Sequence, residues 1–117
     1  QLGDAFESLA AQWLKDKGLT IIQRNYRCKA GEIDLIARDD STLVFVEVRA
    51  RSNPRYATAA ASVDRRKQHR LLRTAQHYLC SHPKTADLPC RFDVIAIEPR
   101  QFPAHTAVRW IRSAFTG

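Results

Sequence analysis

Two acidic residues on neighbouring predicted strands suggest the chemistry of this chain. Segments 32–38 and 43–49 are rich in apolar and β-branched residues, which predicts two strands joined by a tight turn. Side chains alternate between the faces of a strand, so Asp34 and Glu47 are expected on one face of adjacent strands. Burying an isolated carboxylate is costly, and two together suit a hard cation such as Mg²⁺ or Mn²⁺. The alternative is a structural ion pair in which Arg49 neutralises one acid.

Two helical residues are further candidates for the same site. A helix is predicted over 64–81, and Gln68 falls inside its apolar side. Its amide would either order a water beside the acids or bond to a backbone group. A second helix is predicted over 4–17, where Glu7 lies at the edge of the apolar face and would reach the acids. The alternative for Glu7 is a capping box with Asp4, which satisfies the first amides of the helix.

The positive charge of the chain is concentrated in one stretch. The 117 residues include 19 Lys and Arg against 12 Asp and Glu, for a net charge of +7. Residues 49–73 hold eight basic residues and one acidic residue, so this window carries the whole excess. Such a stretch is typical of a protein that binds a polyanion. The alternatives are an acidic membrane or protein surface as partner, or a solvated helix face.

Nucleic acid is therefore the expected partner of this basic stretch, through contacts to phosphates. The candidate nucleic-acid-binding residues are Arg51, Arg55, Arg65, Arg66, Lys67, Arg70 and Arg73.

Length and composition predict one globular domain over residues 1–117. The three cysteines, Cys28, Cys80 and Cys90, are odd in number and widely spaced. This excludes a disulfide framework, offers no paired spacing for zinc, and favours a reducing, cytoplasmic compartment. No apolar run reaches the roughly 18 residues of a membrane span, so no membrane is expected as partner.

The remaining elements complete an α/β fold. Three more strands are predicted over 19–26, 91–98 and 107–112, and a long loop over 50–62. The order is αβββαββ, in which three strands joined by tight turns precede a helical crossover. This order predicts a mixed five-stranded sheet flanked by helices.

The motifs resemble those of a known nuclease superfamily. GEIDLI at 31–36, a turn, and FVEVRAR at 45–51 resemble the core of the PD-(D/E)xK superfamily. Similarity to the YraN family, small bacterial proteins that resemble archaeal Holliday-junction resolvases, runs through nearly the whole chain. It includes GDAFE at 3–7, RNYR at 24–27 and WIRSAF at 110–115.

The resemblance implies a restriction-endonuclease-like fold and a role for each matching residue. Asp34 and Glu47 match the metal-binding acids, and the backbone carbonyl of Val48 matches a further ligand. Glu7 matches a helical acid of the resolvase-like branch, and Gln68 matches a helical glutamine beside its catalytic site. The implied cofactor is Mg²⁺ or Mn²⁺.

Arg49 departs from the superfamily pattern because it stands where a catalytic lysine is expected. An arginine stays charged in proteins and is a poor general base. It still stabilises negative charge on a pentavalent phosphorane, so we retain Arg49 among the catalytic candidates.

Three functions compete on these observations. The first is a divalent-metal-dependent endonuclease that hydrolyses phosphodiesters. By analogy with resolvases its substrate would be branched DNA rather than RNA, cut by a homodimer. The second is a catalytically silent nucleic-acid-binding module of the same fold, and the third is a protein-interaction domain with a basic face.

Overall fold

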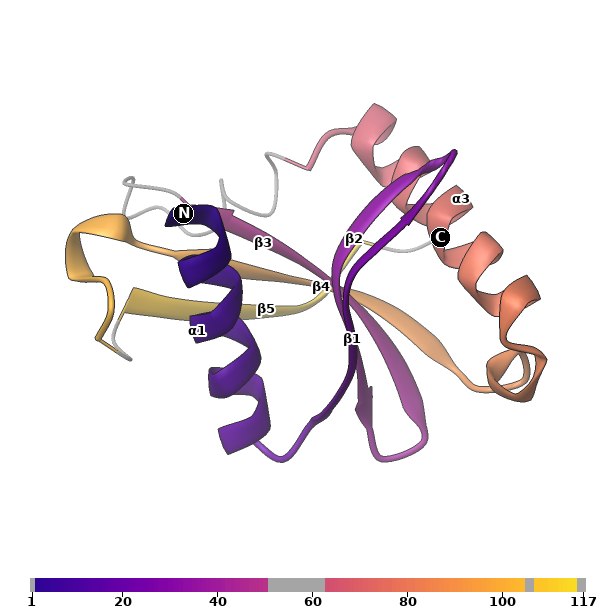
Figure 1. The fold of residues 1–117 in the computed structure, drawn as a ribbon, viewed down its shortest axis with the longest axis horizontal. Helices are drawn as coiled ribbons and strands as arrows, with labels where there is room; N and C mark the ends of the chain where they lie inside the picture. Colours follow the sequence, from indigo (N-terminus) through magenta and orange to yellow (C-terminus); the bar gives the residue numbers. More distant parts are fainter. Residues whose placement is uncertain (1, 51–62, 105–106, 116–117) are drawn as a thin grey trace.

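The computed structural model describes residues 2–50, 63–104 and 107–115. Its main elements follow the predicted order αβββαββ (Figure 1). In chain order they are α1 (Leu2–Asp16), β1 (Thr20–Cys28), β2 (Gly31–Asp39), β3 (Thr42–Ala50), α3 (Arg65–Ser81), β4 (Cys90–Ile97) and β5 (Val108–Phe115).

The five strands form one mixed sheet, as predicted. Their order in the sheet is β1-β2-β3-β4-β5, the same as their order in the chain. β3 and β4 pair in parallel, and the other neighbours pair antiparallel. The parallel pair requires a long connection between its strands, and α3 lies in that connection.

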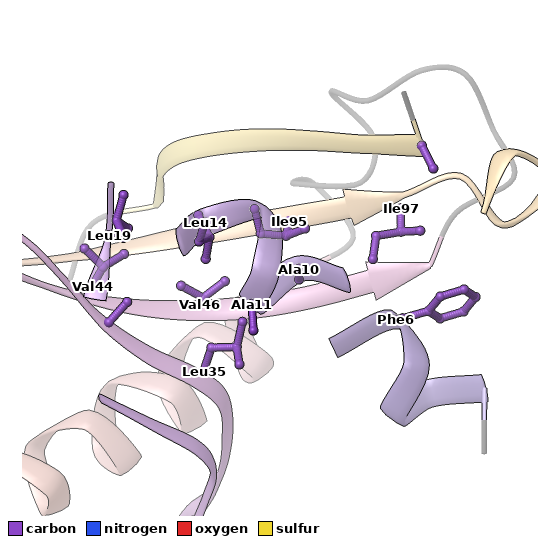
Figure 2. Packing of buried hydrophobic residues seen from close by; sticks show 12 residues of the cluster. Phe6, Ala10, Ala11, Leu14, Leu19, Leu35, Val44, Val46, Ile95 and Ile97 are labelled. Carbon is purple, nitrogen blue, oxygen red and sulfur yellow. The ribbon is translucent and has the colours of Figure 1, made fainter. Parts of the chain in front are cut away.

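Each face of the sheet is covered by a helix with its own hydrophobic cluster. On one face, α1 packs its buried residues Phe6, Ala10 and Leu14 onto the sheet (Figure 2). On the other face, α3 contributes Leu71, Ala75 and Tyr78 to a second cluster. The strand residues divide between the two clusters by alternation: Val44, Val46, Ile95 and Ile97 lie with α1, and Leu43, Phe45, Phe92 and Val94 lie with α3. The near-continuous apolar pattern of β3 therefore reflects burial on both faces.

The start of α3 is defined by a side-chain cap. Asp64 is the N-cap, and its Oδ1 accepts a hydrogen bond from the backbone N–H of Lys67 at 2.9 Å. The helix ends at Ser81, and Pro83 begins a short 3-10 turn, Pro83–Thr85. The predicted limits of 64–81 thus differ from the observed ones only in that Asp64 caps the helix.

Two local predictions were wrong. α1 begins at Leu2, so Asp4 lies within its first turn and is not an N-cap. The capping box of Asp4 with Glu7 is therefore not formed. The negative charge of Asp4 instead interacts favourably with the positive end of the helix dipole. The last strand continues to Phe115, three residues beyond the predicted limit, because Phe115 pairs with Phe92 of β4 across a register shift.

The predicted loop over 50–62 also needs one correction. Ala50 belongs to β3, and residues 51–62 lie outside the described residues, together with the candidates Arg51 and Arg55. No helix in the described part of the chain is long and apolar enough to cross a membrane.

The turn between β1 and β2 packs directly against α3. A Cβ atom added at Gly31 would lie 3.1 Å from Thr74 Oγ1 and 3.9 Å from Arg70 Cβ. Nearby, the Tyr26 hydroxyl of β1 forms a hydrogen bond with His77 Nδ1 of α3. These contacts set how close α3 approaches the strand that carries Asp34.

We expect Gly31→Ala to lower the free energy of unfolding by about 2 kcal/mol, because Gly31 has a φ of +153° and a methyl group would lie 3.1 Å from Thr74 Oγ1, a tight contact. Urea denaturation measures this loss. Gly3→Ala is the matched control, because no heavy atom lies within 4 Å of a Cβ at Gly3. Equal stability of both variants and the unmodified protein would contradict the close packing at Gly31.

Candidate functional site

Asp34 and Glu47 meet where β2 and β3 stop pairing. The antiparallel register between these strands ends at Leu35 and Val46. Asp34 and Glu47 occupy the next position on each strand, just beyond this last pair. Here the Val48 backbone N–H donates to Asp34 Oδ2 at 2.8 Å. A side chain thus satisfies this backbone donor and holds the Asp34 carboxyl against β3.

The buried carboxyl group of Glu47 lies against the half-buried carboxyl group of Asp34. Glu47 is 5% exposed, and the two side chains hydrogen-bond. Burial raises the pKa of Glu47 to about 7, and the charge of Asp34 adds to this effect. Burial also raises the pKa of Asp34, although the bond from the Val48 amide opposes the rise. This arrangement favours a proton or a cation between the two acids.

The other buried carboxylates of the described residues have different surroundings. Asp93 accepts hydrogen bonds from Arg91 Nε, Trp110 Nε1 and the Ser113 amide. Glu98 is bound by the backbone and guanidinium of Arg100, and these hydrogen bonds lower its pKa. Hydrogen bonds therefore satisfy both groups within the structure.

Glu47, by contrast, faces a second acid. A pKa raised by burial and by a neighbouring acid is a feature that many functional sites share.

Two cations nevertheless approach Glu47. Arg49 Nε lies 3.5 Å from Glu47 Oε2, which is the ion pair that the sequence offered as an alternative. Lys67 Nζ of α3 lies 3.4 Å from the same oxygen. Lys67 was predicted only as a phosphate-binding residue, so its position beside Glu47 was missed. A signal was available: Lys67 stands four residues before the buried Leu71, on the side of α3 nearest the sheet.

The side-chain amide of Gln68 binds the backbone just before α3 begins. Its Nε2 donates to the Val63 carbonyl oxygen at 2.8 Å. This is the backbone bond that we considered as one of its two roles, and Gln68 makes no hydrogen bond to the acids within the described residues. Val48 reaches the site through its amide, which binds Asp34.

Glu7 lies within electrostatic reach of the acid pair. Burial raises its pKa, and so do the negative charges of Asp34 and Glu32. Its Oε1 atom is buried and has no hydrogen-bond partner among the residues that the structure describes. A hydrogen bond with the Asn25 side chain acts in the opposite direction. Asn25 has a left-handed backbone conformation, with φ of 55°, which sequence analysis did not single out.

The residues suit a divalent cation in their chemistry. The donors are all carboxylate oxygens, which Mg²⁺ and Mn²⁺ prefer, and Asp34 and Glu47 bring two of them together at one place. Across the described ranges, however, no three His, Cys, Asp or Glu side chains are gathered closely enough to hold a metal. The site is thus a two-carboxylate site, with Glu7 beside it.

The outer face of α3 carries a row of exposed basic residues. The side chains of this face are exposed, as the helical periodicity predicted, and in the part of the chain that the structure describes they form no ion pairs. These residues are Arg65, Arg66, Arg70 and Arg73.

The family model and the similar proteins found by comparison all carry the same family description. A model described as "Uncharacterised protein family UPF0102" matches residues 6–97. A UPF0102 protein of Alcanivorax borkumensis is 50% identical to this chain, covering 93% of the chain and 86% of the relative. One from Saccharophagus degradans is 49% identical, over 99% and 93%. The UPF0102 protein YraN of Salmonella arizonae is 48% identical, over 98% and 84%.

The raised pKa of Glu47 predicts a pH-dependent stability. The folded protein binds this proton more tightly than the unfolded chain, so the stabilisation is complete below pH 4.5 and is lost as the pH rises to about 7. In EDTA, Glu47→Gln is expected to be as stable as the unmodified protein at pH 4.5. At pH 8 it should be more stable by about 3 kcal/mol. Urea denaturation at both pH values measures the difference.

Glu98→Gln is the control, because its effect on the free energy of unfolding at pH 8 should have the opposite sign. Its hydrogen bonds with Arg100 lower the pKa of Glu98, so the loss of this anion is expected to destabilise the protein at pH 8. That loss should shrink as the pH falls through the lowered pKa. A Glu47→Gln effect that does not change with pH would contradict the buried acid pair.

Proposed function

The chain belongs to the UPF0102 family, and we propose that it is a divalent-metal-dependent endonuclease that hydrolyses phosphodiesters in DNA. The observation that carries the proposal is the contact of half-buried Asp34 with buried Glu47, two acids whose pKa values are raised mainly by desolvation. A protein gains no stability from burying two carboxyls together, so the pair is best explained by a cation that it binds. The motifs GEID and FVEVR support the same activity by resemblance.

Each residue of the site has a distinct task in this proposal. Asp34 and Glu47 bind the cation, and the Val48 amide holds the Asp34 carboxyl by a hydrogen bond. The chemistry that a divalent cation supplies when bound is activation of water and neutralisation of phosphate charge. Glu7 adds a third negative charge at the edge of the site.

Arg49 supports hydrolysis through its charge. It follows Glu47 by two residues on β3 and keeps its guanidinium 3.5 Å from the Glu47 carboxylate. Because an arginine remains charged, it is suited to stabilise negative charge that develops on the phosphate and is unsuited to remove a proton from water.

The outer face of α3 is suited to bind the nucleic-acid backbone. Arg66, Arg70 and Arg73 are spaced by four and three residues, so they lie on one side of the helix over about 10 Å. Guanidinium groups bind phosphates well, and contacts of this kind carry no sequence information. We therefore propose a substrate recognised by shape and charge. Branched DNA fits this description, and paired cuts in a four-way junction would require a homodimer.

A catalytically silent nucleic-acid-binding module is the second candidate. It is favoured by the ion pairs of Glu47 with Arg49 and Lys67, which partly neutralise the acid without a metal. This candidate keeps the basic face of α3 and needs no divalent cation.

Cleavage of a labelled four-way DNA junction tests the proposal. With Mg²⁺ or Mn²⁺ the unmodified protein is expected to cut the junction. Glu47→Ala, which removes half of the acid pair, is expected to lose at least about 100-fold in rate, since each such group contributes several kcal/mol. Gel electrophoresis of the labelled strands measures the rate.

Linear duplex, single-stranded DNA and RNA serve as control substrates and show which structure is preferred. Equal cleavage by Glu47→Ala would indicate a contaminating nuclease. No cleavage, with junction binding that persists in EDTA, would overturn the endonuclease and leave the silent module.

The face of α3 predicts a defined dependence of DNA binding on salt. Replacing Arg66, Arg70 and Arg73 together by Gln is expected to weaken binding. The replacement should also reduce the slope of log K against log salt by about 0.9 for each lost phosphate contact on duplex DNA. Fluorescence anisotropy at several salt concentrations, in EDTA, measures the slope.

Lys15→Gln is the control, because Lys15 is an exposed cation on α1, which packs on the opposite face of the sheet. A triple variant with an unchanged slope would mean that this face of α3 does not contact the backbone.

A further inference from the structure

Lys67 differs from the other basic residues at the start of α3. Arg65 and Arg66 are exposed, whereas the Lys67 side chain is 29% exposed and turns toward the sheet. Its Nζ lies 3.4 Å from Glu47 Oε2, and Arg49 Nε lies 3.5 Å from the same oxygen. The ammonium of Lys67 is thus in contact with a buried acid of the pair rather than available to a phosphate.

The backbone of Lys67 is fixed by the first turn of α3. Its N–H donates to the N-cap Asp64, and Gln68 Nε2 bonds the Val63 carbonyl. Val63 is itself buried, at 1% exposed, in the cluster beneath α3. These hydrogen bonds hold the backbone at Lys67, while the four-carbon side chain can turn its ammonium from one acceptor to another.

We infer that Lys67 is the resident counter-cation of the acid pair, and that a divalent cation bound by Asp34 and Glu47 displaces its ammonium. This inference rests on the proposed function, because it assigns Lys67 to the same site. Two positive groups and a divalent cation around one carboxylate oxygen repel each other strongly in a buried setting.

Of the two cations at Glu47, Lys67 is the one that a divalent cation can displace. Arg49 is carried by β3 itself, close to Glu47, whereas Lys67 reaches across from a helix. Once displaced, the ammonium lies between the acid pair and the exposed arginines of α3, where a phosphate would be held. Lys67 would then contact the substrate only in the cation-bound protein.

Metal affinity tests the inference without any nucleic acid. Titration calorimetry with Mn²⁺ is expected to show about tenfold tighter binding to Lys67→Gln than to the unmodified protein, because the competing ammonium is gone. Lys67→Arg retains the charge and should not bind more tightly. Lys84→Gln changes the net charge equally at an exposed position outside the site, and its affinity should be unchanged.

A second measurement follows the ammonium itself. In protein labelled at lysine side chains, Mg²⁺ is expected to shift the NMR signal of Lys67, identified by its absence in Lys67→Gln, and to leave that of Lys84 in place. Unchanged or weaker Mn²⁺ affinity in Lys67→Gln would overturn the inference. A Lys67 signal that does not shift when Mg²⁺ is added would also overturn it.

These outcomes separate the two proposals. Tighter Mn²⁺ binding by Lys67→Gln, together with an unmodified protein that cuts no DNA, would overturn the endonuclease and support the role of Lys67. No binding of Mn²⁺ to any variant would overturn both. Cleavage that requires metal, with equal Mn²⁺ affinities, would overturn the role of Lys67 alone.

Discussion

The contact between the Asp34 and Glu47 carboxyls is the constraint around which this part of the molecule is organised. Two acids in contact, one buried and one half-buried, cannot both carry full charge at little cost, so their surroundings must supply a proton or positive charge. The protein supplies it from two elements, Arg49 on the same strand as Glu47 and Lys67 on the crossover helix. The end of β2–β3 pairing makes room for the contact, and the Val48 amide holds it in place.

The fold explains how the protein can hold these two carboxyl groups in contact. Both faces of the sheet are covered, by α1 and by α3, and the strands that carry the acids lie in the interior of the sheet (Figure 1). The remaining buried carboxylates are satisfied by hydrogen bonds to guanidinium, indole and amide groups. Among the buried carboxylates of the described residues, Glu47 alone has a second acid against it, an arrangement that is common at binding and catalytic sites.

The crossover helix joins the two halves of the proposed function. Its inner side brings Lys67 to the acid pair, and its outer side presents Arg66, Arg70 and Arg73 to solvent. The close approach of Gly31 to Thr74 fixes the distance between this helix and the strand of Asp34. A phosphate backbone held by the outer arginines would therefore lie at a set distance from the acids, which is what hydrolysis of one bond requires.

The sequence by itself determined the order of elements, the mixed sheet, the common face of Asp34 and Glu47, and the exposed basic side of α3. These follow from periodicity, turn residues and charge, which are local properties of the chain. Only the tertiary structure decided that Lys67 meets Glu47, that Gln68 bonds Val63, and that Glu7 stays outside a three-acid cluster. Those contacts depend on how α1 and α3 cross the sheet and where two strands separate. Residues far apart in the chain set that geometry, and no short stretch of sequence encodes it.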